Sequence, residues 1–174
     1  MTGREFLNSI ANGEVDVLAM LLDILRNTGT DYCVVGGLAV NAYAEPVVSL
    51  DLDLVVVSAR IPDLTEAASA AGMKVEQFEH SVNLTLPGSD LRIQLQKDPR
   101  YQGFISRATV HTVLGYEMSV ACIEDVLAGK LWAYSDETRR GSKRQKDLAD
   151  IMRLVETHPE LRSLLPDEVR KFID

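Results

Sequence analysis

The segment over residues 50–57, with the sequence LDLDLVVV, constrains the fold of this chain more than any other segment. Its length and its richness in Leu and Val are typical of a buried β-strand. Side chains two positions apart on a strand point to the same face, so Asp51 and Asp53 share one face and the leucines fill the other. The segment therefore predicts a strand that buries one face and carries two neighbouring carboxylates on the opposite face.

These two carboxylates need an explanation, because they repel each other and lose hydration unless a cation lies between them. One interpretation is an edge strand with a solvated acidic face. The other is a divalent-metal site, since hard oxygen ligands at this spacing suit a Mg²⁺ ion that bridges substrate phosphates. We favour the metal site, in which Asp51 and Asp53 are both catalytic residues and metal ligands.

Hydrophobic spacing and turn residues divide the rest of the 174-residue chain into short helices and strands. We expect helices over residues 14–27, 38–44, 62–71, 124–135 and 142–157, and one or two short turns in 159–173. We expect strands over residues 32–35, 50–57, 74–78, 81–86 and 91–96, with less regular strands over 108–114 and 116–122. This order predicts an α+β fold, with an α/β-type mixed sheet, flanking helices and a C-terminal helical tail.

The length suits one domain rather than two. We expect a single domain over 1–174, made of an α/β core over 1–122 and a helical C-terminal subdomain over 123–174. No apolar run is long enough to cross a membrane, and the first residues lack the pattern of a secretory signal. Cys33 and Cys122 lie in apolar, strand-like contexts without the spacing of a metal or redox site, which is typical of reduced core residues in a cytoplasmic protein.

The chain carries a net charge of −8 at pH 7, which disfavours binding along an extended nucleic-acid duplex. The average hides one basic segment, residues 139–146 (RRGSKRQK), which contains five basic side chains and no acid. Such a segment is either a solvated face or a site for a compact anionic ligand. Its Lys143 and Lys146 precede Asp147 and Asp150 by four residues, which is the spacing of ordinary surface ion pairs on a helix.

Two further features could bind a phosphate or oppose a charge. Gly36–Gly37 lies between a predicted strand and a predicted helix, where glycines let backbone N–H groups approach a phosphate, although many such pairs are only tight turns. Lys130 lies within the apolar stripe of the helix predicted over 124–135. Its ammonium group therefore either reaches the rim of that face or points at a charge.

The order of these features along the chain is itself informative. A strand, Gly36–Gly37 and a short helix precede Ser-x-Asp-x-Asp at Ser49, and two later helices carry Lys130 and the sequence KDLADI from Lys146. Over residues 31–154 this order resembles the DNA polymerase beta-like nucleotidyltransferase superfamily. It is most similar to the small nucleotidyltransferase proteins of abortive-infection and type IV toxin–antitoxin systems. The resemblance implies a nucleotidyltransferase-like core and a cognate antitoxin as a partner.

The resemblance also implies roles for individual residues. Asp51 and Asp53 would hold up to two Mg²⁺ ions on the triphosphate of an NTP substrate. The other contacts to the nucleotide and its phosphates would come from Gly36, Gly37, Ser49, Lys130, Lys143 and Lys146. The remaining basic side chains of the segment, Arg139, Arg140 and Arg144, are expected to face solvent. The implied reaction transfers a nucleoside monophosphate to a hydroxyl group of an RNA or tRNA end, a protein or a small molecule, and pyrophosphate leaves.

One position departs from the pattern of that family. The family supplies a third carboxylate from a neighbouring strand, and the matching position here is Gln94. Because Ile93 and Leu95 alternate with it toward the core, Arg92 and Gln94 share the other face, which offers a cation and a neutral amide in place of an anion. Two hypotheses therefore stay open: an active Mg²⁺-dependent nucleotidyltransferase, and a catalytically silent module of the same fold that binds a nucleotide or a partner.

Overall fold

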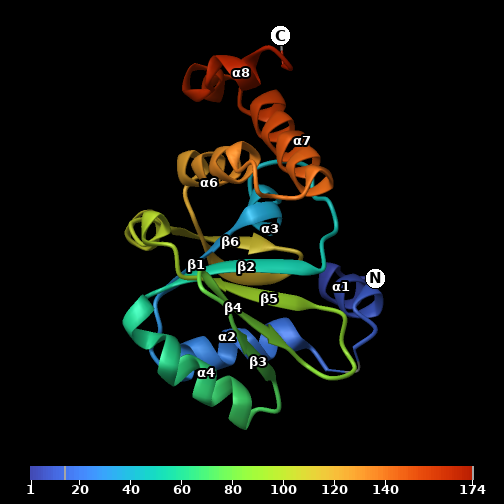
Figure 1. Ribbon diagram of the computed structural model, residues 1–174. Coiled ribbons are helices and arrows are strands. Elements are labelled where there is room, and N and C mark those ends of the chain that lie inside the picture. The colour runs from blue at the N-terminus through green and yellow to red at the C-terminus, as the bar shows by residue number, and fades with distance from the viewer. Residues whose placement is uncertain (14, 174) are drawn as a thin grey trace.

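The computed structural model describes residues 1–13 and 15–173, which form a seven-stranded mixed sheet with helices on both faces (Figure 1). The strands are β1 (Tyr32–Val35), β2 (Asp51–Val56), β3 (Lys74–Gln77), β4 (Ser81–Thr85), β5 (Arg92–Gln96), β6 (Thr109–Val113) and β7 (Tyr116–Val120). Their order across the sheet is β3-β4-β5-β2-β1-β7-β6. The β2–β5 and β1–β7 pairs are parallel, and the other pairs are antiparallel. This mixed sheet confirms the predicted fold class.

Helices cover the sheet from both sides. They are α1 (Gly3–Ile10), α2 (Val17–Asn27), α3 (Gly36–Val40), α4 (Ile61–Ala70), α5 (Phe104–Arg107), α6 (Ile123–Ser135), α7 (Gly141–Thr157) and α8 (Asp167–Arg170), with 3-10 turns η1 (Ser58–Arg60), η2 (Pro99–Tyr101) and η3 (Pro159–Leu164). In Figure 1, α2 and α4 pack together below the sheet, whereas α3, α6 and α7 pack together above it. The division of the chain at residue 122 stays a prediction.

Strand β2 lies in the middle of the sheet, between β5 and β1. Its Leu52 and Leu54 are buried, whereas Asp51 and Asp53 are only partly buried, as their alternation predicts. The interpretation of the two carboxylates as the solvated face of an edge strand is therefore wrong. Because β2 is paired on both sides, its register is fixed, and the two carboxylates have fixed neighbours.

The sequence-based prediction missed α1 and placed the start of α3 too late. α1 begins with a capping box, in which Thr2 Oγ1 accepts from the backbone N–H of Glu5 and the Glu5 carboxylate accepts from that of Thr2. The Thr-x-x-Glu spacing is a recognisable signal for a helix start. α3 begins at Gly36 instead of residue 38, because the glycine pair is part of its first turn. The helix predicted from residue 14 begins at Val17, and Glu14 lies outside the described residues.

The two cysteines have different surroundings. Cys33 is buried in β1, and burial raises the pKa of its thiol to about 12, which is typical of an unreactive core cysteine. Cys122 lies at the N-terminal cap of α6 and is only partly buried, because β7 ends earlier than predicted, at Val120. Both thiols are free.

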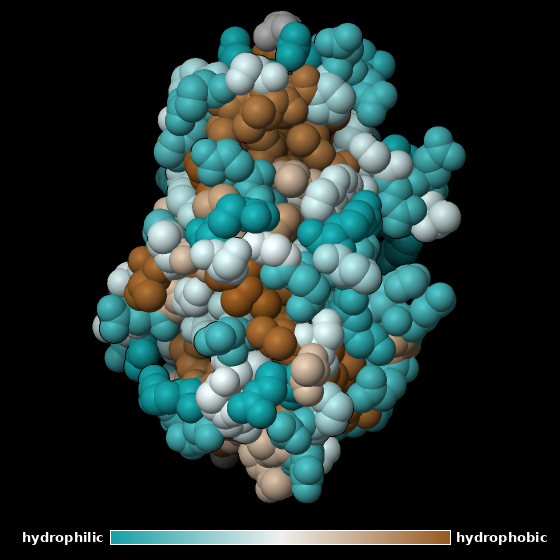
Figure 2. Space-filling view, turned by 90° about the vertical axis from the view of Figure 1, so that its left-hand side faces the viewer, coloured by the Kyte–Doolittle hydropathy of each residue, from teal (hydrophilic) through white to brown (hydrophobic). Residues whose placement is uncertain are grey.

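Figure 2 shows one side of the molecule, where hydrophilic side chains surround an apolar patch at the upper end, at the level of α8 in Figure 1. Inside that end, Leu161, Leu165 and Val169 of the C-terminal turns are buried. Among the helices that the structure describes, none combines the length and the apolar character needed to cross a membrane.

Candidate active site

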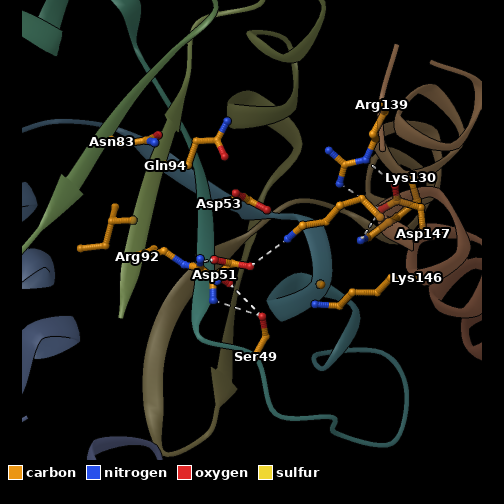
Figure 3. A pocket seen from close by; sticks show the side chains of 13 residues that line it. Ser49, Asp51, Asp53, Asn83, Arg92, Gln94, Lys130, Arg139, Lys146 and Asp147 are labelled. Carbon is orange, nitrogen blue, oxygen red and sulfur yellow. Dashed lines mark hydrogen bonds and ion pairs between the residues drawn. The ribbon is translucent and has the colours of Figure 1, made fainter. Parts of the chain in front are cut away.

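A cavity of about 270 Å³ lies between the carboxylate-bearing face of β2 and the helices α6 and α7 (Figure 3). Its sheet side is lined by Asp51, Asp53, Asn83, Arg92, Ile93 and Gln94, and its helix side by Lys130, Arg139, Lys143, Lys146 and Asp147. Gly37 and Ser49 complete the lining. Of the site residues predicted from the sequence, all except Gly36 line this one cavity. It therefore brings together residues that are as much as 110 positions apart in the chain, from Gly37 to Asp147.

The register between β2 and β5 sets the neighbours of the two carboxylates. Asp51 lies beside Arg92, and Asp53 lies beside Gln94. Gln94 in turn lies beside Asn83 of β4. A row of side chains thus crosses three strands, from Asp53 through Gln94 to Asn83 (Figure 3). The position at which the resemblance implies a third carboxylate holds a neutral amide.

Both carboxylate oxygens of Asp51 face cations. Arg92 Nε lies 2.7 Å from Oδ1, and Lys143 Nζ lies 3.4 Å from Oδ2. Just before β2, the backbone N–H of Asp51 donates to Ser49 Oγ over 3.1 Å. Lys143 therefore reaches from α7 across the cavity to the sheet, and Ser49 fixes the backbone at the point where the chain enters β2.

Asp53 is compensated less completely than Asp51. Within the described part of the chain it forms no ion pair, in contrast to the two ion pairs of Asp51. Burial raises the pKa of Asp53 above its ordinary value, an effect that Lys130 opposes and Asp51 reinforces. The protein alone thus does not fully stabilise the charged form of this carboxylate, and a bound cation would stabilise it.

Gly36 makes room for Asp53. Its φ of +72° lies in the left-handed region, and a side chain at this position would overlap with Asp53 Oδ2. Gly37 is under less constraint, because a Cβ there would lie 3.6 Å from Asp150 Oδ2, an ordinary contact distance. The glycine pair is therefore more than a tight turn, since its first member allows α3 to begin directly against a carboxylate of the site.

Lys130 points at charges and not at solvent. Its ammonium group is buried between two buried carboxylates of α7, with Nζ 3.1 Å from Asp147 Oδ1 and 2.7 Å from Asp150 Oδ2. The contact with Asp150 is an ion pair without hydrogen-bond geometry. Lys130 lines the cavity, but its charge is already balanced by the protein.

The surface ion pair predicted between Lys143 and Asp147 is wrong. Asp147 is only 1% exposed and binds Lys130 together with Arg139, whose Nε lies 2.7 Å from Oδ2. Arg139 is exposed, as expected, but it also lines the cavity beside Asp147 (Figure 3). A four-residue spacing identifies neighbouring side chains on one helix. It does not predict ion pairs with residues outside that helix.

The ion pair predicted between Lys146 and Asp150 is wrong for the same reason. Asp150 binds Lys130 and Arg153, whose Nη1 lies 2.8 Å from Oδ1. Lys146 is exposed, lines the cavity and has no ion pair among the described residues. Arg144 also differs from expectation, because its Nε donates to the Tyr134 carbonyl oxygen over 2.7 Å. The exposure predicted for Arg140 is confirmed.

Arg153 connects α7 to the loop that precedes β2. It donates to Asn41 Oδ1 over 3.0 Å and to the carbonyl oxygen of Glu45. Near the end of α7, His158 Nε2 lies 2.7 Å from the carbonyl oxygen of Tyr43. Helix α7 and its C-terminal cap thus hold the segment through which the chain enters the carboxylate-bearing strand.

Asn83 is a cavity residue that the sequence analysis missed. Its Oδ1 is buried and has no hydrogen-bond partner in the described part of the chain. The signal was present in the alternation of β4, where Asn83 lies between the fully buried Val82 and Leu84. A polar residue at this position shares its face of the sheet with Gln94.

The two carboxylates fit a hard divalent cation as one part of its ligand set. Mg²⁺ is commonly bound in proteins through one or two carboxylates, substrate phosphates and water. Across residues 1–13 and 15–173, no group of three or more His, Cys, Asp or Glu side chains could hold a metal ion. An ion at Asp51 and Asp53 would therefore take most of its ligands from substrate and water, with Lys143 and Lys146 on the facing wall.

A mixed sheet, a Gly-Gly turn, an Asp-x-Asp strand and cations on the facing helices together define the nucleotidyltransferase class of proteins. Comparison with known families agrees with this class. The chain belongs to the AbiEii family of nucleotidyl transferase toxins of type IV toxin–antitoxin systems, whose family model matches residues 22–174. The superfamily resemblance inferred from the sequence is thereby confirmed. A search of curated protein sequences finds no match.

Several solved structures share the fold at low sequence identity. The antibiotic-resistance factor ANT(2'')-Ia is 12% identical with a TM-score of 0.61, over 90% of this chain and 87% of that one. The lincosamide antibiotic adenylyltransferase LnuA, with lincomycin bound, is 11% identical with a TM-score of 0.57, over 82% and 99% of the two chains. An antigenic nucleotidyltransferase-like protein from Paracoccidioides brasiliensis is 20% identical with a TM-score of 0.55, over 95% and 84%. At these identities the likeness shows the fold alone.

Proposed function

We propose that this chain transfers a nucleoside monophosphate from an NTP to the hydroxyl group of an acceptor, with Mg²⁺ as cofactor and pyrophosphate as the leaving group. The observation that carries the proposal is the pair of same-face carboxylates, Asp51 and Asp53, which faces the lysines of α7 across one cavity. Such transfer needs positioning and charge neutralisation more than covalent help from the protein. The cavity offers carboxylates for a cation and ammonium groups for phosphates.

The proposal gives the cavity residues distinct roles. Asp51 and Asp53 hold Mg²⁺, which when bound neutralises the triphosphate and favours attack at its α-phosphorus. Lys146 is exposed and without an ion pair in the described structure, so it is free to bind a phosphate. Lys143 contacts Asp51 at 3.4 Å and is 43% exposed, so it can turn from the carboxylate to a phosphate.

Backbone groups and Lys130 support this arrangement. Gly37 and Ser49 line the cavity and are assigned to binding phosphate oxygens, while Gly36 leaves room for the Asp53 side chain beside them. Lys130 acts as a positioning residue, because Asp147 and Asp150 already balance its charge. We assign it to holding α6 against α7 and not to a phosphate contact.

The acceptor hydroxyl belongs to an RNA or tRNA end, a protein or a small molecule. The net charge of −8 favours binding a polynucleotide at its end over binding along a duplex. LnuA, by its description, is an adenylyltransferase for a small antibiotic, so this fold accommodates acceptors of that size. Membership of the AbiEii family supports a toxin activity and a cognate antitoxin as partner. We place the protein in the cytoplasm.

Calorimetric titration with Mg-ATP, Mg-GTP, Mg-CTP and Mg-UTP tests the metal site. We expect the wild-type chain to bind at least one of them, and the Asp51→Asn/Asp53→Asn variant to bind it about 100-fold more weakly, because the cation loses both protein carboxylates. Asp167→Asn, which removes an exposed carboxylate of α8, is the control and should bind normally. Absence of binding by the wild type, or equal binding by both chains, would contradict the assignment.

A labelled-NTP transfer assay, with total RNA and lysate proteins as acceptors, separates the enzyme from the catalytically silent module. Transfer of label that depends on Asp53 supports the enzyme. A wild-type chain that binds Mg-NTP without transferring label, together with a Gln94→Asp variant that gains transfer, would support the silent module instead.

A further inference from the structure

We propose that this site binds one divalent cation and not two, and that the guanidinium group of Arg92 supplies the second positive charge beside Asp51. The inference rests on the proposed function and deepens it. It assigns Arg92 a role as the charge-compensating residue of the metal site. It also explains why the neighbouring strand can carry Gln94 without a further carboxylate.

The sheet holds Arg92 next to Asp51. The two residues are directly paired in the parallel register of β2 and β5, and their side chains lie on the same face. Arg92 Nε lies 2.7 Å from Asp51 Oδ1. The Arg92 side chain is 65% exposed, but its backbone is fixed because β5 is paired with β4 on one side and β2 on the other. The guanidinium group therefore stays within reach of this carboxylate.

The two carboxylates differ in the number of ion pairs that they form with the protein. Asp51 already has Arg92 at one oxygen and Lys143 at the other. Asp53 has no ion pair in the described part of the chain, so a cation that binds there meets a carboxylate whose oxygens have no cationic partner in direct contact. A second dication at Asp51 would lie a few ångströms from a guanidinium group and would be repelled by it. If Lys143 turns to a phosphate, Arg92 still remains beside Asp51.

The other neighbours of Asp53 provide no additional anion. The row from Asp53 continues with the amides of Gln94 and Asn83, and Asn83 Oδ1 is buried without a hydrogen-bond partner. Neutral amide oxygens can complete the ligand shell of one cation, directly or through water. In two-metal sites the ions lie about 3.5–4 Å apart. Of the two carboxylates that the protein offers here, only Asp53 lacks an ion pair within the described residues, so the protein itself supplies little free negative charge for a second dication.

Counting bound Mn²⁺ ions tests the inference without any turnover. The full chain is mixed with Mn²⁺ and a non-hydrolysable analogue of the NTP that binds in calorimetry. Bound ions are counted by equilibrium dialysis, and magnetic coupling between neighbouring ions is detected by electron paramagnetic resonance. We expect one ion per chain and an uncoupled spectrum for the wild type, and two coupled ions for the Arg92→Gln/Gln94→Asp variant. Two coupled ions in the wild type, or one ion in the double variant, would overturn the inference.

The affinity for Mn²⁺ without nucleotide gives a second, independent readout. Arg92→Gln should bind Mn²⁺ about tenfold more tightly than the wild type, because one repelling charge has been removed. Arg92→Lys should bind like the wild type. Arg26→Gln is a matched control, because it changes the net charge equally in an exposed ion pair on α2, and it should also bind like the wild type. Equal affinities of the wild type and Arg92→Gln would overturn the inference.

These measurements also separate the inference from the function on which it rests. If the analogue binds normally and brings two ions, only the proposed ion count fails. If neither Mn²⁺ nor any NTP analogue binds to the wild type, the proposed nucleotidyltransferase function fails, and the ion count fails with it.

Discussion

Two pairs of aspartates lie on opposite sides of the cavity, and the protein compensates them in different ways. The helical pair, Asp147 and Asp150 of α7, is almost fully buried. Lys130 lies between the two carboxylates, and Arg139 and Arg153 bind their outer oxygens. Both carboxylates of this pair are therefore compensated by side chains of the protein itself.

The strand pair, Asp51 and Asp53 of β2, is balanced only in part. Asp51 forms two ion pairs, whereas Asp53 forms none among the described residues, and burial raises its pKa against the opposing effect of Lys130. The first pair thus joins α6 to α7, whereas for the second pair we have proposed the binding of a cation. Each of the following variants tests one side of this contrast.

The largest effect is expected for Asp53→Asn on activity. Transfer of label from NTP should fall about 1,000-fold, because the uncompensated carboxylate for the cation is lost. The free energy of unfolding should not fall, because no ion pair within the described structure is broken. Transfer assays and urea denaturation measure the two quantities. A variant that loses stability together with activity would contradict the division between the two aspartate pairs.

The next largest effect is expected for Asp147→Asn on stability. The free energy of unfolding should fall by about 3 kcal/mol, because the buried Lys130 loses one of its two partners and Arg139 loses its carboxylate. Asp23→Asn is the matched control, since it breaks an exposed pair with Arg26 and should cost at most about 0.5 kcal/mol. Equal costs in urea denaturation would show that the α7 cluster does not stabilise the fold.

A smaller effect should separate the two glycines beside the strand pair. Gly36→Ala should lower the free energy of unfolding by about 2 kcal/mol, because the new methyl group overlaps with Asp53 in a backbone conformation that disfavours side chains. Gly37→Ala should change it by less than about 1 kcal/mol, since its Cβ meets only ordinary contacts. Thermal or urea denaturation of both variants measures the difference, and similar costs would exclude the overlap at Gly36 as its cause.

The smallest effect concerns pH. An acid whose pKa is higher in the folded than in the unfolded state binds its proton more tightly when the protein is folded. The free energy of unfolding therefore falls as the pH rises from the pKa of the unfolded state through the pKa of the folded state. Asp53 is such an acid. Without divalent ions, Asp53→Asn should therefore be slightly more stable than the wild type at pH 7. This gain should shrink as pH falls toward the ordinary Asp value of 3.8. A gain that grows on acidification would contradict the raised pKa.

The strand side of the site could be predicted from the sequence because local alternation determines it. The apolar residues of β2 fix which face is buried, and this places Asp51 and Asp53 together on the other face. The same alternation on β5 places Arg92 and Gln94 on one face. The parallel pairing of β2 with β5 then makes them neighbours of the carboxylates, and alternation within one strand does not reveal this pairing.

The helix side could not be predicted in the same way. Four-residue spacing along α7 correctly places Lys143 near Asp147, but the burial of Asp147 against α6 favours Lys130, 17 residues away. Arg139 is drawn into the cavity by that same buried carboxylate. The ion pairs on this side of the cavity depend on how α6 packs against α7. The residue pattern of one helix alone does not predict that packing.

The hydrogen bonds that connect α7 with the loop before β2 bear on the synthesis of the chain. Arg153 binds Asn41, which lies 112 residues earlier, and His158 binds the backbone of Tyr43. During translation the N-terminal part leaves the ribosome first, so the loop lacks its contacts with Arg153 and His158 until α7 follows. A nascent chain that ends before α7 therefore lacks Lys143 and Lys146 of the cavity, and it lacks the contacts of Arg153 and His158 with the loop before β2. The activity proposed for the protein should thus arise late in its synthesis, only once α7 has emerged and folded.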